Sequence, residues 1–261
     1  MLFEPNPIAF TLLGLEIRWY GILIALGMIL GGLVMYRRGP RYGLDSERLL
    51  DLLILGIPVG ILGARLYYVI FNWSWYITSE GTIDWVKIIN IRTGGLAIHG
   101  GLIFAFIAVA ILCRRYHYHP ADVLDAAVPG IALAQSIGRW GNFFNSEAHG
   151  GPTDLPWGIP VDGQMVHPTF LYESIWCFLL FILLIYVGNR RKFTGQILLL
   201  YSGLYSIERF FVEGLRTDSL MLGPFRQAQL LSGTVIILSL ILYGILYHRW
   251  KNKDVEKEIG E

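Results

Sequence analysis

The residues from 138 to 150 place polar side chains where an apolar stretch ends. They read Gly-Arg-Trp-Gly-Asn-Phe-Phe-Asn-Ser-Glu-Ala-His-Gly, so that Asn142, Asn145 and Glu147 follow Arg139 within eight residues. A lone arginine near a helix end would simply extend to the lipid headgroups. A charge at membrane depth costs at least about 2.5 to 3.5 kcal/mol on insertion scales and usually faces a polar cavity. Because a guanidinium can grip a phosphate through two hydrogen bonds, we expect a pocket that recognises a phospholipid headgroup.

A second polar constellation lies further along the chain. Tyr205, Arg209, Glu213 and Arg216 are spaced by four, four and three residues, and Glu208 directly precedes the first arginine. This spacing puts the first four side chains on one face of a helix. Arg209 and Glu213 could merely neutralise each other against a neighbouring helix, since buried ion pairs are often only structural. The face is richer than one ion pair requires, which favours a functional site.

Three more residues could carry chemistry or support it. His99 stands among glycines in Gly-Gly-Leu-Ala-Ile-His-Gly-Gly, and a neutral imidazole can accept a proton near pH 7, although lone histidines in apolar stretches are usually structural. Arg65 could extend a phosphate site, or it could pair with a helix carbonyl or an acid. Glu173, early in an apolar segment, could support the pocket or the loops above it.

The composition is that of a polytopic membrane protein. Of 261 residues, 54% are hydrophobic and 16% charged, which is more apolar surface than a soluble domain could bury. The net charge of +1 gives no basic field for nucleic acid. About 20 apolar residues cross a bilayer. Seven segments meet this requirement and predict spans at 19–36, 49–71, 96–113, 121–140, 169–188, 195–213 and 227–248.

Charge in the connecting segments predicts the orientation. Alternate loops on one side, together with the tail at 249–261, hold 13 of the 21 lysines and arginines. The positive-inside rule therefore predicts an N-terminus outside and a C-terminus inside. Residues 1–16 contain no lysine or arginine, so the basic region of a cleavable signal is missing and the first span is expected to stay. Residues 251–261 mix both charges, and we expect this end of the chain to be frayed.

Two outer segments are longer than simple connections. Residues 72–95 contain three tryptophans and should lie along the outer interface, whereas the Gly- and Pro-rich residues 143–168 predict a compact, irregular cap. The expected fold is an all-α integral membrane protein, a seven-transmembrane helix bundle with a small irregular outer-face cap, in a single membrane domain over 1–261. Cys113 and Cys177 lie in apolar spans without Cys-x-x-Cys spacing, which indicates inert buried thiols.

The run Gly-Arg-x-Gly-Asn-Phe-x-Asn-x-Glu-x-x-Gly, which ends at Gly150, resembles the signature of the prolipoprotein diacylglyceryl transferases. The segment 208–216 resembles the second arginine-bearing motif of that family, and His99 matches its His-Gly-Gly motif. Tyr20, in Arg-Trp-Tyr-Gly, matches its N-terminal tyrosine, although aromatic anchoring at the interface would explain this residue nearly as well. The resemblance covers nearly the whole chain.

This resemblance implies an enzyme that moves the diacylglyceryl group of phosphatidylglycerol onto a lipobox cysteine of a prolipoprotein, in the bacterial cytoplasmic membrane with its site toward the outer face. It implies that the partners are the two substrates and membrane lipid, with no nucleic acid, cofactor or metal. His99, Arg139 and Arg209 would be catalytic. Glu213, Glu147 or unaided thiolate formation remain alternatives to His99 as base. The substrate-binding residues would be Tyr20, Arg139, Asn142, Asn145, Glu147, Gly150, Tyr205, Glu213 and Arg216.

Other chemistry and other classes are less well supported by the sequence. It contains no His-Glu-x-x-His, no Gly-x-Ser-x-Gly elbow, no phosphate-binding loop ending in Lys-Ser/Thr and no paired-aspartate magnesium motif. A transporter could use the same arginines to bind an anion in transit, but the chain lacks the internal repeat that transporters often show. A membrane scaffold would have little reason to keep Arg139 and Arg209 within the bilayer.

Overall fold

The computed structural model describes residues 5–78, 80–91 and 94–259. Within this part of the chain, seven helices have 18 residues or more, and each begins within three residues of the start of a predicted span. Their bounds are α1 (Trp19–Arg38), α2 (Ser46–Phe71), α4 (Ile98–Arg115), α5 (Pro120–Phe144), α6 (Thr169–Gly188), α7 (Gln196–Leu215) and α8 (Gln227–Ile259).

Five of these helices, α1, α2, α4, α6 and α8, are long and apolar enough to cross a membrane by length and composition. Helices α5 and α7 are of similar length but carry more polar side chains, including those of both constellations named above. The tail from residue 251, which was predicted to be frayed, continues α8 as far as Ile259. Residues 260 and 261 lie outside the described part.

Three short hairpins correct the expectation of an all-α fold. Each pairs two antiparallel strands: β1 (Ile8–Leu12) with β2 (Leu15–Arg18), β3 (Ile159–Val161) with β4 (Gln164–Val166), and β5 (Met221–Leu222) with β6 (Phe225–Arg226). The second hairpin lies within the cap that was predicted to be irregular. Its turn is Asp162-Gly163, both with positive φ, and Asp-Gly is a strong hairpin signal that the Gly- and Pro-rich composition obscured.

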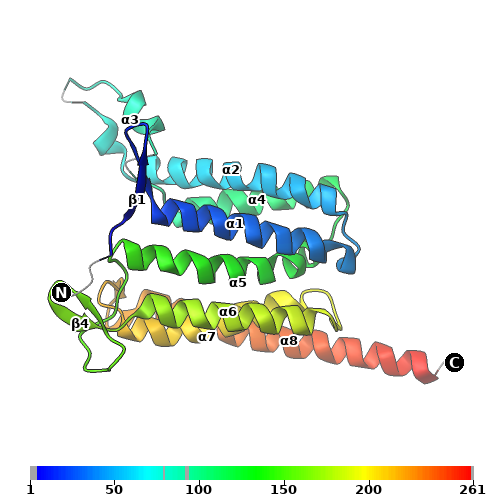
Figure 1. Ribbon diagram of the computed structural model, residues 1–261. Helices are drawn as coiled ribbons and strands as arrows, with labels where there is room; N and C mark the ends of the chain where they lie inside the picture. Colours follow the sequence, from blue (N-terminus) through cyan, green and yellow to red (C-terminus); the bar gives the residue numbers. More distant parts are fainter. Residues whose placement is uncertain (1–4, 79, 92–93, 260–261) are drawn as a thin grey trace. The chain divides into compact units, whose positions relative to one another are not determined.

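The chain divides into two compact units (Figure 1). Unit 1 comprises Met1–Arg41 and Leu124–Glu261, and unit 2 comprises Tyr42–Val123. In unit 2, α2 packs along α4, and the segment between them holds the 3₁₀ turn η2 (Trp73–Tyr76) and the short helix α3 (Trp85–Ile89). Another 3₁₀ turn, η1 (Gly39–Tyr42), follows α1. Residues 79, 92 and 93 of the predicted interfacial segment lie outside the described residues.

Small residues let helices approach closely in both units. In unit 1, a Cβ added to Gly31 would lie 2.6 Å from the Gly130 carbonyl oxygen, and one added to Gly27 would lie 3.0 Å from that of Ala134. Helices α1 and α5 therefore touch backbone to backbone, as small-residue stripes permit in membranes. In unit 2, Gly100 of α4 packs against the Gly63 carbonyl of α2 in the same manner.

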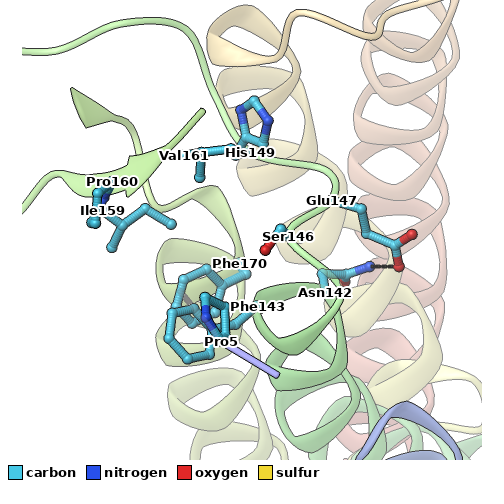
Figure 2. A pocket seen from close by; sticks show the side chains of 10 residues that line it. All are labelled: Pro5, Asn142, Phe143, Ser146, Glu147, His149, Ile159, Pro160, Val161 and Phe170. Atoms are coloured by element: carbon cyan, nitrogen blue, oxygen red, sulfur yellow. Dashed lines mark hydrogen bonds between the residues drawn. The ribbon is translucent and has the colours of Figure 1, made fainter. Parts of the chain in front are cut away.

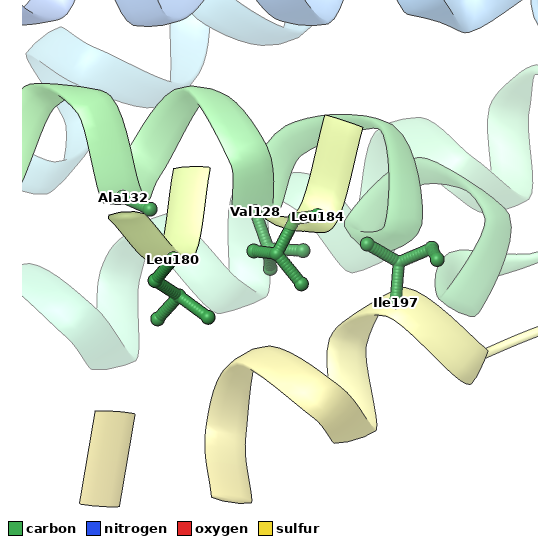
Figure 3. Packing of buried hydrophobic residues seen from close by; sticks show 5 residues of the cluster. All are labelled: Val128, Ala132, Leu180, Leu184 and Ile197. Atoms are coloured by element: carbon green, nitrogen blue, oxygen red, sulfur yellow. The ribbon is translucent and has the colours of Figure 1, made fainter. Parts of the chain in front are cut away.

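The apolar core of unit 1 lies between α5, α6 and α7 (Figure 3). Figure 3 shows Val128 and Ala132 of α5 facing Leu180 and Leu184 of α6, with Ile197 of α7 completing the cluster; each of these residues is 3% exposed or less. Tyr201 and Tyr205 of α7 pack against this cluster and continue it along the helix. The core thus fixes the three helices that carry the polar constellations.

One aspartate joins α5 to the start of α7. Asp125 is fully buried and accepts hydrogen bonds from the backbone N–H groups of Gly195 and Leu198, each at 2.8 Å, and from Arg191 Nη1 at 2.9 Å. It therefore satisfies N–H groups that the first turn of α7 leaves without helical partners. From the sequence alone, Asp125 would be expected only to stabilise the N-terminal part of its own helix, α5. In the structure it caps α7 instead.

Candidate functional site

Two constellations predicted from the sequence meet at one end of unit 1. Arg139 lies near the end of α5, Arg209 and Glu213 lie in the last two turns of α7, and Arg216 follows that helix directly. Because α6 runs in the opposite direction, its first turns lie at the same end and bring Glu173 to the group. Two separate polar patches of sequence thus form one cluster of alternating charge.

Glu173 is the centre of this arginine–glutamate cluster. Its side chain is fully buried, it forms an ion pair with Arg139 Nη2, and its Oε1 lies 3.9 Å from Arg216 Nη1. A carboxylate buried among apolar helices would be very costly without such partners. The two arginines therefore give the Glu173 carboxylate cationic partners, and Glu173 in turn fixes their guanidinium groups.

The second ion pair of the cluster lies on α7. Arg209 Nη2 is 2.5 Å from Glu213 Oε2, one turn later, and Glu213 is almost fully buried. Arg209 Nη1 is also buried and has no hydrogen-bond partner. Glu213 thus holds the guanidinium on one side, and an N–H group on the other side is left to donate to an anion.

Further residues of α6 and α7 lie beside the charged side chains of the cluster. Tyr205 lies beside the Arg139 guanidinium and stacks on Tyr201 at a centroid distance of 5.7 Å. Glu208 is 6% exposed, and neither of its carboxyl oxygens has a hydrogen-bond partner. Cys177 is fully buried nearby. The sequence predicted Tyr205 on the same face of α7 as Arg209, and in the structure it lies beside Arg139.

A loop crosses close to the cluster at Gly150. The Gly150 N–H donates to the His167 carbonyl at 2.9 Å, and Gly150 pairs with Arg216 as an isolated β-bridge. A Cβ on Gly150 would lie 2.6 Å from His167 Cβ and 3.1 Å from the Leu215 carbonyl oxygen. Only glycine fits this close approach, so the family signature residue at this position serves backbone packing beside the arginines.

Arg216 is also held from the outer side. Its Nε and Nη2 donate to the two carboxylate oxygens of Asp218 at 2.9 and 2.6 Å. These hydrogen bonds lower the pKa of Asp218. Arg226, at the end of the third hairpin, donates to the Glu213 carbonyl and caps the end of α7. The last turn of α7 is therefore fixed by these two arginines in addition to Arg209 on the helix itself.

The asparagines of the signature form a separate polar turn (Figure 2). Asn142 Nδ2 and Asn145 Nδ2 donate to Glu147 Oε1 at 3.0 and 3.2 Å. Figure 2 shows Asn142 and Glu147 at one side of a pocket of about 280 Å³, whose other walls include Phe143, Phe170 and strand β3. In the described part of the chain, no hydrogen bond or ion pair joins the three polar residues to the arginines.

Tyr20 lies on the same turn region from the side of α1. A Cβ added to Gly141 would lie 2.5 Å from Tyr20 Cδ2, so the ring rests on the glycine that separates Arg139 from Asn142. Trp19 stacks on Phe144 at 5.1 Å in the same region. Tyr20 is 40% exposed, which fits both a wall of the site and an interfacial anchor.

His99 lies in unit 2, in the first turn of α4. Its side chain is exposed, and its ring lies 6.2 Å from that of Tyr67 on α2. The start of α4 is held to α2 by a hydrogen bond of 3.0 Å from the Ala97 N–H to the Ala64 carbonyl, and by the contact of Gly100 with Gly63. The imidazole therefore lies at a helix end that is held in place by contacts with α2.

Arg65 has the structural role that the sequence left as an alternative. It is buried on α2, and all five of its N–H groups donate to backbone carbonyls at 2.7 to 3.0 Å. The acceptors are Lys87, Ile88, Asn90, Gly94 and Gly95. No N–H remains for a phosphate. Arg65 therefore anchors the segment that leads into α4 and His99.

Comparisons with known proteins cover nearly the whole chain. A model of the family described as prolipoprotein diacylglyceryl transferase matches residues 7–245. A protein of Clostridioides difficile named phosphatidylglycerol–prolipoprotein diacylglyceryl transferase is 50% identical over 98% of this chain and 99% of its own length. Proteins of the same name from Finegoldia magna and Clostridium novyi are 50% and 48% identical, each over 97% of this chain and all of their own. The chain belongs to the prolipoprotein diacylglyceryl transferase family.

The structure draws attention to two buried acids that sequence reasoning undervalued. Glu173 was expected only to support the cap or pocket, yet it forms ion pairs with both Arg139 and Arg216. Its position in a strongly apolar helix was the available signal, because a carboxylate at membrane depth is usually functional. Glu208 was noted only as the residue before Arg209, and no pattern revealed that its carboxyl group is left without a partner.

Proposed function

We propose that this protein transfers the diacylglyceryl group of phosphatidylglycerol to the lipobox cysteine of a prolipoprotein. The family and the names of relatives that are half identical over nearly the full length support this activity. The observation that carries it at the atomic level is the arginine–glutamate cluster at one end of an apolar bundle. Phosphatidylglycerol, the prolipoprotein and membrane lipid are the proposed partners.

The proposed reaction is a displacement at carbon. The cysteine sulfur attacks the carbon of the diacylglyceryl unit that bears the phosphate. The C–S bond of a thioether forms as the bond between this carbon and the phosphate oxygen breaks, and glycerol 1-phosphate leaves with the bonding electrons. The thiol proton passes to a base. Negative charge therefore grows on the phosphate in the transition state, and donors fixed around it lower the barrier.

Arg139 and Arg209 are the proposed phosphate ligands. Each guanidinium is held on one side by a buried glutamate, and the free Nη1 of Arg209 supports its assignment. Such preorganised donors need little rearrangement as charge develops, which is why they stabilise a transition state more than water does. Arg216, Tyr205 and Glu213 are proposed to orient these groups.

His99 is the proposed base for the thiol proton. The two alternative carboxylates are already engaged: Glu213 by Arg209, and Glu147 by the amides of Asn142 and Asn145. The imidazole of His99 is exposed, and among the described residues no hydrogen bond or ion pair engages it, so a ring nitrogen is available to accept a proton.

The remaining signature residues are proposed to shape the entrance to the site. Asn142, Asn145 and Glu147 would form a polar rim beside the 280 Å³ pocket, Gly150 would keep the covering loop close, and Tyr20 would border the headgroup. All seven long helices are proposed to cross the bacterial cytoplasmic membrane as one domain. The N-terminus would be outside, the C-terminus inside and the site toward the outer face, in accordance with the basic inner loops.

A transfer assay tests the proposal directly. Purified protein would be incubated with phosphatidylglycerol labelled in its diacylglyceryl part and with a lipobox peptide, without added metal or nucleotide. We expect mass spectrometry to detect a peptide heavier by the labelled diacylglyceryl group and released glycerol phosphate. A matched peptide with serine in place of the cysteine should remain unmodified. Failure of folded protein to modify the cysteine peptide, or equal modification of the serine peptide, would contradict the proposed chemistry.

A further inference from the structure

Glu208 is a buried acid that the proposed reaction does not use. It lies on α7 with 6% exposure, and among the described residues no donor forms a hydrogen bond with either carboxyl oxygen. The charged and titratable groups that face it are Glu173 and Cys177 on α6, Arg139 on α5, and Tyr205 and Arg209 on its own helix. Its position within the cluster makes its charge important for any anion that binds there.

The neighbouring ion pairs indicate which carboxyl group holds a proton. Two carboxylates close together in a poorly solvated site cannot both ionise cheaply. Glu173 forms ion pairs with Arg139 and Arg216, and Glu213 forms one with Arg209, so each of these two carboxylates has a cationic partner. Glu208 shares none of these ion pairs. An ionised, unpartnered carboxylate at this depth would cost more than a neutral carboxyl group.

The charge of the cluster follows from this assignment. Its cations are Arg139, Arg209, Arg216 and Arg226, and its paired anions are Glu173, Glu213 and Asp218. With Glu208 neutral, the cluster carries one net positive charge. With Glu208 ionised, it carries none.

We propose that Glu208 is protonated in the lipid-free site and thereby sets the cluster to one net positive charge, which matches the single negative charge of a phosphodiester headgroup. Glu208 is a positioning residue in this role, since it acts through the field of Arg139 and Arg209. The inference rests on the proposed function for the identity of that lipid. Loss of the proton would leave a neutral cluster, and an anion would then bind with net negative charge in a poorly solvated site.

The test measures the affinity of detergent-solubilised full-length protein for phosphatidylglycerol from mildly acidic to alkaline pH. We expect the wild-type affinity to fall at least about tenfold, equivalent to about 1.4 kcal/mol, as Glu208 loses its proton. The phosphodiester stays singly charged throughout. Glu208→Gln and Glu208→Leu should both bind the lipid with nearly constant affinity over this range, because either side chain is permanently neutral. Two different variants guard against a folding defect in one of them.

Matched variants and a spectroscopic readout separate the possible outcomes. Two control variants should keep the wild-type pH dependence of lipid affinity. Cys177→Ala removes a titratable neighbour of Glu208 on α6, and Glu16→Gln changes an acid on the exposed first hairpin. Infrared difference spectra of the lipid-free protein should show a protonated carboxyl band that Glu208→Gln lacks. Absence of that band, or pH dependence that persists in both Glu208 variants, would overturn the inference. Lipid binding with the expected pH dependence but without thioether formation would instead contradict the proposed function alone.

Discussion

Arg139 is the residue whose shape matters as much as its charge. Its guanidinium can bind Glu173 and a phosphate at the same time because its N–H groups point in fixed, divergent directions. Arg139→Lys keeps the charge and loses this fork, so we expect it to reduce the transfer rate about 100- to 1000-fold, nearly as much as Arg139→Ala. The measurement is the transfer rate at equal amounts of folded protein. Arg18→Lys, at an exposed position, is the control, and near-normal activity of Arg139→Lys would show that charge alone suffices.

His99 and Arg209 should differ in how their loss depends on pH. If His99 takes the thiol proton, His99→Gln should be slow near neutral pH and partly recover as the thiol, with an ordinary pKa near 8.5, ionises unaided. Arg209→Gln lacks a phosphate donor, so its defect should persist at every pH and also weaken phosphatidylglycerol binding. The transfer rates of both variants between neutral and mildly alkaline pH provide the comparison. Parallel profiles would leave His99 a structural or lipid-positioning residue.

Among the helices, α7 depends on an acid that belongs to α5. Asp125 binds the first N–H groups of α7 together with Arg191. Asp125→Ala leaves the Gly195 and Leu198 N–H groups without this acceptor and Arg191 without this carboxylate, and should reduce the free energy of unfolding by about 3 to 5 kcal/mol. Unfolding of the protein in detergent measures the effect. Asp154→Ala, at an exposed site in the cap, should change stability by less than about 0.5 kcal/mol, and an equal loss in both variants would refute the capping role of Asp125.

The segment before α4 depends in a similar way on one side chain of α2. Arg65→Lys replaces five fixed donors with a single ammonium group, so most of the hydrogen bonds to residues 87–95 are lost. We expect hydrogen exchange to accelerate in the segment 94–100, with little change of phosphatidylglycerol affinity. A large loss of lipid affinity without faster exchange would instead identify Arg65 as a phosphate ligand.

At the scale of the whole molecule, close helix contacts limit which residues are tolerated far from the site. A Cβ on Gly130 would overlap the Gly31 carbonyl oxygen, so Gly130→Ala must push α5 away from α1. We expect it to destabilise the folded protein by about 1 to 3 kcal/mol and to lower activity, since α5 carries Arg139. Thermal unfolding in detergent checks this. Gly56→Ala, where an added Cβ meets nothing within 4 Å, is the matched control and should be neutral.

Much of this protein follows from its sequence because the bilayer restricts the choice of structure. Apolar segments of about 20 residues must form helices that satisfy their own hydrogen bonds, so the seven long helices begin close to where hydropathy places them. The signature at 138–150 and the polar face from Tyr205 to Arg216 indicated the site, because charges at membrane depth are rare and costly. The hairpin at Asp162-Gly163 was predictable from its turn residues but was hidden by the composition of the cap.

Only the tertiary structure decided which polar groups meet. Glu173 pairs with Arg139 from a different helix, 34 positions away in the sequence, and Asp125 caps a helix that begins 71 positions later. Arg65 has backbone carbonyls as its partners, and these have no signature in the identity of their residues. The periodicity of a helix determines which of its own side chains share a face, but the rotation and depth at which helices pack determine what that face touches. For the same reason, the unpartnered carboxyl group of Glu208 could be recognised only once α5, α6 and α7 were in place.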